Sequence, residues 1–329
     1  MASPAVDDVR HAWRIAWAAF VVAMFGWGVG FYGPGVYLAA LHRVHGWSIA
    51  TISLAITAHF LVSAVLITAL PDAYRRFGAA SVTIAGALCA AAGAVAWTSA
   101  PQIWLLVPAL LLSGVGWSAM SGAALNLIVA PWFERDRPKA ISMAFNGASI
   151  GGLLFTPLWT TLIAHVGLTA AGLAIALATV VVICPLAWLV LRRTGPGSAA
   201  KAAPPLPRRA LLGQWRFLTM SAAFALGLFV QIGLFAHLIA RLEPAFGATI
   251  AALAISLATL CAVLGRSAMG WLLGGHDRRL AAAANLLVQA AGTLLLAFGE
   301  GMAPLALGCV LFGLGVGNLT SLPPLIAQR

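Results

Sequence analysis

The stretch ATIAALAISLATLCAVLGRSAMGWLL, residues 248–273, decides the class of fold. It carries no charge except Arg266, and it exceeds the about 20 apolar residues that a helix needs to cross a lipid bilayer. A charge at that depth costs roughly 2.5–3.5 kcal/mol, so an arginine there marks a functional position. A guanidinium also suits a carboxylate or phosphate, which it binds through paired hydrogen bonds. The stretch therefore predicts a membrane span that carries an anion-binding group.

The rest of the chain has the same apolar character. Hydrophobic residues make up 62% and charged residues 8% of its 329 residues, and the mean hydropathy is +0.98. A soluble domain has about 25% charged residues, so composition excludes that class. The apolar runs are too long for the strands of a membrane barrel, which need about 9–11 residues. We expect an all-helical membrane protein with spans at 15–41, 49–70, 79–97, 103–129, 140–163, 168–191, 217–240, 248–273, 280–298 and 304–326.

The net charge of +11 is distributed as in a membrane protein rather than a nucleic-acid-binding protein. If the N-terminus is cytoplasmic, every lysine and arginine except Arg43, Arg241 and Arg266 falls in a cytoplasmic tail or loop. An excess of basic residues in cytoplasmic loops is the usual bias of inner-membrane proteins. We expect a multi-pass protein of the cell (inner) membrane with a cytoplasmic N-terminus and no nucleic-acid partner.

The two parts of the chain resemble each other. The segment 112–116 (LSGVG) matches 311–315 (LFGLG), and Arg75-Arg76 matches Arg278-Arg279 at a similar offset. A segment rich in Gly, Pro, Ala and Ser at 194–215 separates them and reads as a cytoplasmic linker.

A parallel repeat of six spans resembles the architecture of major facilitator transporters. We expect an N-terminal six-helix bundle at 1–193 and a C-terminal bundle at 216–329 that contains four of its six helices. On this prediction the last two helices are missing and the sequence is truncated after the tenth span. A natural protein of ten spans is the alternative.

Two motifs match enzyme signatures by chance. The segment 28–33 fits G-x-G-x-x-G, but it lies within a predicted span, and no acid follows before Asp72. The segment 147–151 fits G-x-S-x-G, but no span holds an acidic residue that would orient a histidine base. Both segments are better explained as close helix contacts. We expect no enzymatic activity, no cofactor and no metal site.

Arg266 heads the residues that we expect to contact a substrate. Two alternatives remain open for it: the side chain could extend to the membrane edge, or it could pair with backbone carbonyls. Other polar side chains within the spans could bind substrate or could bridge helices. The complete candidate set is Arg266, Tyr32, His59, Asn126, Asn146, Gln231 and His237.

No aspartate or glutamate occurs in any predicted span. Proton-coupled carriers often use buried carboxylates, so proton coupling here would depend on His59, on His237 or on a protonated substrate. Anion exchange and uncoupled transport fit the sequence equally well.

Two segments resemble one branch of the major facilitator superfamily. WFERDRPKA at 132–140, followed by small residues at 144, 147 and 151, is similar to the fifth-helix signature of the monocarboxylate porter group. GRSAMG at 265–270 is similar to an eighth-helix segment of that group, and the related oxalate:formate antiporters also use an arginine in this helix. The resemblance implies that Arg266 binds a substrate carboxylate. Animal members of the group carry an aspartate where this chain has Ala262.

These observations together predict a secondary transporter that moves a small, monocarboxylate-like organic anion by alternating access. A coupling proton or an exchanged anion is a candidate second partner beside the lipid bilayer. The alternatives are a major facilitator exporter of amphipathic compounds and a membrane sensor or assembly protein that transports nothing.

Overall fold

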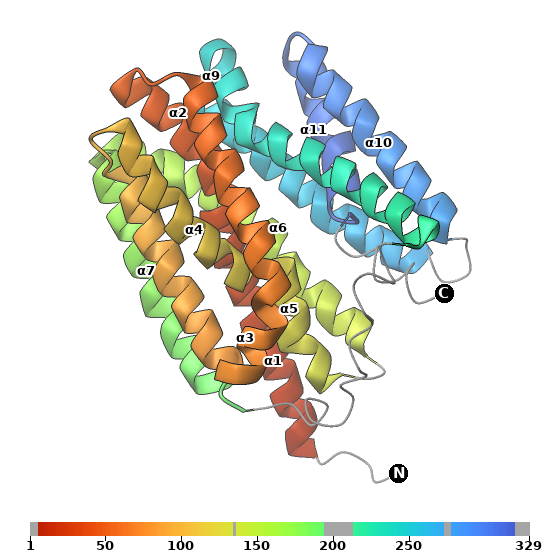
Figure 1. Cartoon of the computed structure of the whole chain (residues 1–329). Helices are drawn as coiled ribbons and strands as arrows, with labels where there is room; N and C mark the ends of the chain where they lie inside the picture. The colour runs from red at the N-terminus through yellow and green to blue at the C-terminus, as the bar shows by residue number, and fades with distance from the viewer. Residues whose placement is uncertain (1–5, 134–135, 194–212, 273–277, 320–329) are drawn as a thin grey trace.

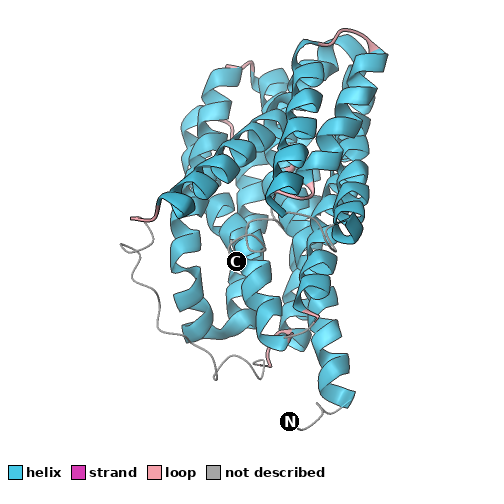
Figure 2. Cartoon of the chain, turned by 90° about the vertical axis from the view of Figure 1, so that its right-hand side faces the viewer, coloured by secondary structure: helices cyan, strands magenta, loops and turns pink. Residues whose placement is uncertain are grey.

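Helices account for all regular secondary structure in the part of the chain that the structure describes. A computed structural model describes residues 6–133, 136–193, 213–272 and 278–319. The helices pack side by side as a bundle (Figures 1 and 2), which confirms the expected all-helical class. In chain order they are α1 (Val6–Phe25), the π-helix η1 (Gly26–Phe31), α2 (Gly33–His45), α3 (Ile49–Thr98), the 3₁₀ turn η2 (Ile103–Leu105), α4 (Leu106–Met120), α5 (Gly122–Val129), the 3₁₀ turn η3 (Ala130–Trp132), α6 (Arg137–Val166), α7 (Leu168–Val190), α9 (Trp215–Leu272), α10 (Arg278–Phe298) and α11 (Met302–Val316).

Among the described residues, 7 helical stretches are long and apolar enough to cross a membrane, and α11 is a shorter apolar helix. Two of the 7, in α3 and α9, each contain two predicted spans. The chain reverses within them at Gly78 (φ 79°) and Gly247 (φ 82°), as Figure 1 shows. Positive φ strains residues that carry a Cβ, which is why glycine occupies both reversals.

Several predicted boundaries were wrong. The residues before Gly78 were expected to form a loop, but Pro71 lies inside α3 and the helix continues past it. The span predicted at 103–129 is interrupted, because Ser121 has an extended backbone (ψ 174°) between α4 and α5. Most of the predicted linker (194–212) and the end of the last predicted span (320–326) lie outside the described residues.

The span predicted at 15–41 contains the π-helix η1 instead of running as one α-helix. In η1 the Tyr32 N–H donates to the Trp27 carbonyl, five residues earlier, at 2.8 Å. Pro34 explains part of the change, because it lacks the N–H that would reach the Gly30 carbonyl in α register or the Val29 carbonyl in π register.

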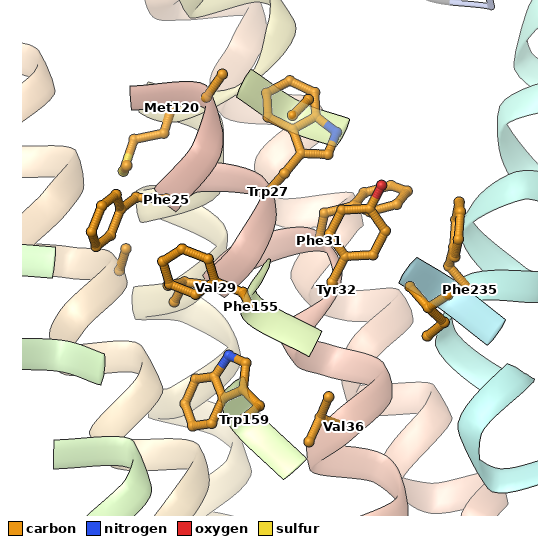
Figure 3. Packing of buried hydrophobic residues seen from close by; sticks show 14 of the residues in the cluster. Phe25, Trp27, Val29, Phe31, Tyr32, Val36, Met120, Phe155, Trp159 and Phe235 are labelled. Atoms are coloured by element: carbon orange, nitrogen blue, oxygen red, sulfur yellow. The ribbon is translucent and has the colours of Figure 1, made fainter. Parts of the chain in front are cut away.

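Three side chains donate hydrogen bonds to consecutive carbonyls of η1. Trp159 Nε1 of α6 donates to the Gly28 carbonyl at 3.2 Å. The Tyr37 hydroxyl donates to the Val29 carbonyl at 3.4 Å, and His59 Nε2 pairs with the Gly30 carbonyl at 3.1 Å. Figure 3 shows the indole nitrogen of Trp159 pointing toward this segment. Backbone groups inside a bilayer must be satisfied within the protein, so these donors stabilise the irregular turn.

We call residues 6–193 the N-half and residues 213–319 the C-half. In the described residues, α6 and α2 of the N-half pack against α9 of the C-half. The approach is close at Gly35, where an added Cβ would lie 2.7 Å from the Phe235 carbonyl. Ser256 Oγ of α9 also donates to the Leu153 carbonyl of α6 at 3.2 Å. At the end of the bundle that contains Gly247, Arg43 and Glu243 form an ion pair between the halves.

The role of Trp159 as a hydrogen-bond donor to η1 can be tested. Trp159→Phe keeps an aromatic ring in a fully buried position but removes the donor to the Gly28 carbonyl. We expect the free energy of unfolding in mixed micelles to fall by about 1 kcal/mol. Trp17→Phe is the matched control, because the Trp17 side chain is 58% exposed. Equal stability of the two variants would contradict the role given to Trp159.

Candidate functional site

Arg266 lies between the two halves, close to the end of α9. Its side chain is only 7% exposed. The neighbouring helix allows this burial, because Gly317 has no side chain: an added Cβ there would lie 2.3 Å from the Ala262 carbonyl and 3.3 Å from Arg266 Cβ. The guanidinium is therefore enclosed by protein, and of the two alternatives to substrate binding, extension to the membrane edge does not fit this geometry.

The guanidinium donates three hydrogen bonds to two different helical segments. Nε donates to the Gly317 carbonyl, just after α11, at 2.9 Å. Nη1 donates to the Phe145 carbonyl at 3.2 Å and to Asn146 Oδ1 at 2.7 Å, both in α6. Arg266 thus joins the C-half to the N-half, and its pairing with backbone carbonyls matches one of the alternatives left open by the sequence.

None of these acceptors carries a formal charge. The ion pairs among the described residues are Arg43–Glu243, Arg75–Asp72 and Lys139–Asp136. Within the same part of the chain, Nη2 of Arg266 has no hydrogen-bond acceptor. A buried charge normally has an ionised partner, so this guanidinium retains the capacity to attract an anion.

Tyr32 lies at the junction between η1 and α2, in the interface between the halves. It is 3% exposed, and its ring contacts Phe31 and Phe235 edge to face, with centroid distances of 5.0 and 5.1 Å. Figure 3 shows Phe235 pointing toward Tyr32 from the C-half. Tyr32 therefore belongs to the same interface as Arg266.

Gly152 of α6 allows this close contact between the halves. An added Cβ at Gly152 would lie 2.4 Å from Thr259 Cγ2 and 2.6 Å from Tyr32 Cζ. Thr259 lies two turns before Arg266 on α9. Any larger residue at Gly152 would separate the phenol from α9, so this glycine positions the interface.

His59 has a different environment from that of Arg266. Its side chain is fully buried in the N-half, and Nδ1 lies 2.8 Å from Ser113 Oγ. The Gly30 carbonyl can only accept, so His59 Nε2 carries a proton, and in the neutral ring Nδ1 accepts from Ser113. Trp97 Nε1 donates to the same hydroxyl at 3.0 Å. Both imidazole nitrogens are therefore used within the bundle, which supports helix bridging at this position.

The three remaining candidates, Asn126, His237 and Gln231, lie in different environments. Asn126 donates to the Gly122 carbonyl of its own helix at 2.9 Å, and His237 is exposed on α9. Gln231 is 5% exposed, and its Oε1 is buried without a hydrogen-bond partner among the described residues. The structure thus brings Asn146 to Arg266 and places Tyr32 in the same interface. His59 and Asn126 have hydrogen-bond partners within the N-half, and His237 is exposed. Among the described residues, no hydrogen bond joins Gln231 to the guanidinium.

Two hydrogen-bond acceptors of Arg266 were not predicted from the sequence. The Phe145 and Gly317 carbonyls are backbone groups, so no residue type identifies them as acceptors. The prediction that 147–151 forms a helix contact is confirmed. Added Cβ atoms at Gly147 and Gly151 would lie 2.0 Å from the Phe20 carbonyl and 2.4 Å from the Met24 carbonyl.

The segment 28–33 is likewise a packing surface. An added Cβ at Gly28 would lie 2.3 Å from the Phe155 ring, and at Gly30 it would lie 3.0 Å from the Trp117 ring. These glycines let aromatic rings approach η1 closely. Close packing, together with the carbonyls that accept from side chains, accounts for the glycines of this segment, so a bound nucleotide is not needed to explain them.

Comparison with known proteins gives a consistent picture. The chain is 24% identical over 112 residues to the uncharacterized MFS-type transporter YcxA of Bacillus subtilis (strain 168). That match covers 34% of this chain and 28% of the relative, so it spans about a quarter of the relative's length. Residues 16–329 match the family model of the Major Facilitator Superfamily. The match covers nearly the entire chain, and the chain therefore belongs to the Major Facilitator Superfamily.

Proposed function

We propose that the chain transports a small organic anion of the monocarboxylate type, and that Arg266 binds its carboxylate. Members of this superfamily move small solutes across a lipid membrane, so a transporter is the function that the family supports. Our proposal goes further than the family and specifies that the solute is an anion. It also includes alternating access between two six-helix halves, a cytoplasmic N-terminus and the inner membrane as the location.

One observation carries the choice of an anion. Arg266 is a buried cation that faces the other half of the bundle, and its described hydrogen-bond acceptors are all neutral. A carboxylate would supply the missing negative charge and would fit the planar guanidinium through two hydrogen bonds. The resemblance of 265–270 to the eighth-helix segment of monocarboxylate porters supports the same assignment.

The coupling mechanism follows from the same residues. His59 is enclosed by hydrogen bonds within the N-half, which makes it a poor proton carrier for a site at Arg266. We therefore propose exchange of anions, or entry of the protonated solute, in place of a histidine relay. Asn146 contacts Arg266 directly, and Tyr32, which lies in the same interface, is the candidate polar group for a contact with the solute.

A second candidate, export of amphipathic compounds, draws support from the aromatic rings near the interface. Trp27 and Trp117 contact each other with a centroid distance of 4.8 Å, and Phe31 contacts Phe235 at 5.7 Å. Aromatic surfaces can hold apolar or cationic solutes. However, Trp27, Phe31 and Phe235 are each at least nine-tenths buried against protein, so packing accounts for them and the anion proposal is preferred.

The proposed role of Arg266 predicts a loss of uptake. Cells that express the full gene should accumulate at least one of lactate, pyruvate, formate and oxalate, and Arg266→Ala should reduce that uptake by at least about tenfold. Arg266→Lys keeps the charge but cannot bind a carboxylate through two parallel hydrogen bonds, so it should retain only part of the rate.

Arg192→Ala is the matched control for this experiment. The Arg192 guanidinium lies over the Trp188 ring at 4.0 Å, at the end of α7, and not between the halves. Each variant should be present in the membrane at the wild-type level. Uptake by Arg266→Ala equal to that of Arg192→Ala would reject the assigned site.

The same cells discriminate between the two candidate functions. If the anion proposal is correct, unlabelled short carboxylates should compete for uptake, and hydrophobic cations should not, because they would bring a second positive charge toward Arg266. Competition or efflux that responds to hydrophobic cations, with no response to any carboxylate, would favour the exporter.

A further inference from the structure

We propose that Asn146 is a positioning residue that competes with the substrate for Arg266, so that binding of a carboxylate releases the contact between α6 and α9. This inference rests on the proposed carboxylate site, and it assigns to one contact of that site the coupling between binding and movement.

The first step concerns the geometry of the guanidinium. A carboxylate binds an arginine through two parallel hydrogen bonds, either to Nη1 and Nη2 or to Nε and Nη2. Nη2 has no acceptor among the described residues, whereas Nη1 and Nε are both occupied. Two-point binding therefore has to displace a protein acceptor, whichever edge of the guanidinium is used.

The second step decides which acceptor is displaced. The Gly317 carbonyl belongs to the C-half, as Arg266 does, so this bond can persist when the halves move apart. The acceptors on Nη1 belong to α6 of the N-half. The Phe145 carbonyl lies inside α6 and also faces a helical N–H four residues later, so it does not depend on Arg266.

The third step concerns Asn146 itself. Its amide oxygen makes the shortest of the three contacts with Arg266, at 2.7 Å, and its side chain is half-buried. A neutral amide is a weaker acceptor for a guanidinium than an ionised carboxylate is. A substrate carboxylate can therefore replace Asn146 on Nη1 and leave the bond between Nε and the Gly317 carbonyl in place.

Displacement of Asn146 removes the shorter of the two hydrogen bonds that the Arg266 guanidinium makes to α6. Other described contacts between α6 and α9 include the hydrogen bond from Arg266 Nη1 to the Phe145 carbonyl, the hydrogen bond from Ser256 to the Leu153 carbonyl and the packing of Thr259 against Gly152. The last two involve only neutral groups. Because linkage is reciprocal, a substrate that weakens the contact between α6 and α9 is in turn bound more tightly when that contact is absent.

The empty and the loaded protein therefore differ in how easily they change conformation. When the empty protein separates α6 from α9, the guanidinium loses the Asn146 oxygen and gains nothing in exchange. When the loaded protein does so, the carboxylate already occupies Nη1. This difference favours exchange of anions over net movement.

The test compares two variants of Asn146 in the full chain, purified in lipid nanodiscs. Asn146→Ala removes the competing oxygen, so binding of the carboxylate should become at least about threefold tighter. Asn146→Asp places an ionised carboxylate beside Arg266, so binding should become at least about tenfold weaker. The probes are lactate, pyruvate, formate and oxalate, each measured directly with labelled compound.

Flux measurements in proteoliposomes provide a second readout. Asn146→Ala should raise the ratio of net efflux to exchange, because its empty form no longer has to break the Asn146 contact. Thr179→Val is the matched control, since it removes a buried polar group of the N-half that donates only within its own helix, to the Ile175 carbonyl at 2.7 Å. The control should change neither the affinity nor the ratio.

The outcomes separate the inference from the proposed function. Opposite shifts in affinity for Asn146→Ala and Asn146→Asp support the competition, because a purely structural role would weaken binding in both variants. Weaker binding by Asn146→Ala would mean that the amide donates to the substrate, and it would overturn the inference while the site at Arg266 stands. Failure of the wild-type protein to bind any of the four carboxylates would overturn both.

Discussion

Inside a bilayer a polar group finds its hydrogen-bond partner within the protein or not at all, and the architecture of this chain depends on that constraint. The effect is clearest where the backbone is irregular. The carbonyls of Gly28, Val29 and Gly30 accept from Trp159, Tyr37 and His59. These donors come from α6, from α3 and from α2 of the same span, so a local break in one span binds two neighbouring helices to it and helps to connect the N-half.

The interface between the halves follows the same rule with a charged donor. Arg266 reaches α6 and the end of α11 at once, and its described acceptors are neutral. Neutral acceptors satisfy Nε and Nη1, but among the described residues Nη2 has no acceptor and the charge has no ionised partner. This combination separates Arg266 from His59, whose neutral ring is fully satisfied. A satisfied neutral group serves as structure, whereas a buried cation with no ionised partner in the described part of the chain is suited to bind an anion that arrives from outside.

Much of the fold could be predicted from the sequence, because the length and hydropathy of the runs reflect the thickness of the bilayer. The reversals at Gly78 and Gly247 fall between predicted spans, and the helix contact at 147–151 was read correctly from two glycines. The π-helix η1 was not predicted. Its conformation depends on donors such as Trp159, which is far away in sequence, and Pro34 alone does not reveal which register the backbone adopts.

The candidate site was predictable only in part. Arg266 stood out because a lone charge in an apolar run is visible in one segment of sequence. Asn146 and Tyr32 were proposed together with His59, Asn126 and His237, and composition gave no reason to rank them. What separates them is orientation: Asn126 turns back to its own helix, whereas Asn146 meets an arginine from the other half. The Phe145 and Gly317 carbonyls are backbone groups, so the residue type at these positions does not reveal that they accept from Arg266.

The most direct test of this account is an experimental structure of the full protein determined with a carboxylate that it transports. The account predicts that the carboxylate contacts Nη1 and Nη2 of Arg266, that Nε still donates to the Gly317 carbonyl, and that Asn146 has left the guanidinium. A carboxylate bound elsewhere, with the contact between Arg266 and Asn146 intact, would contradict it and would leave the arginine as a structural link between the two halves.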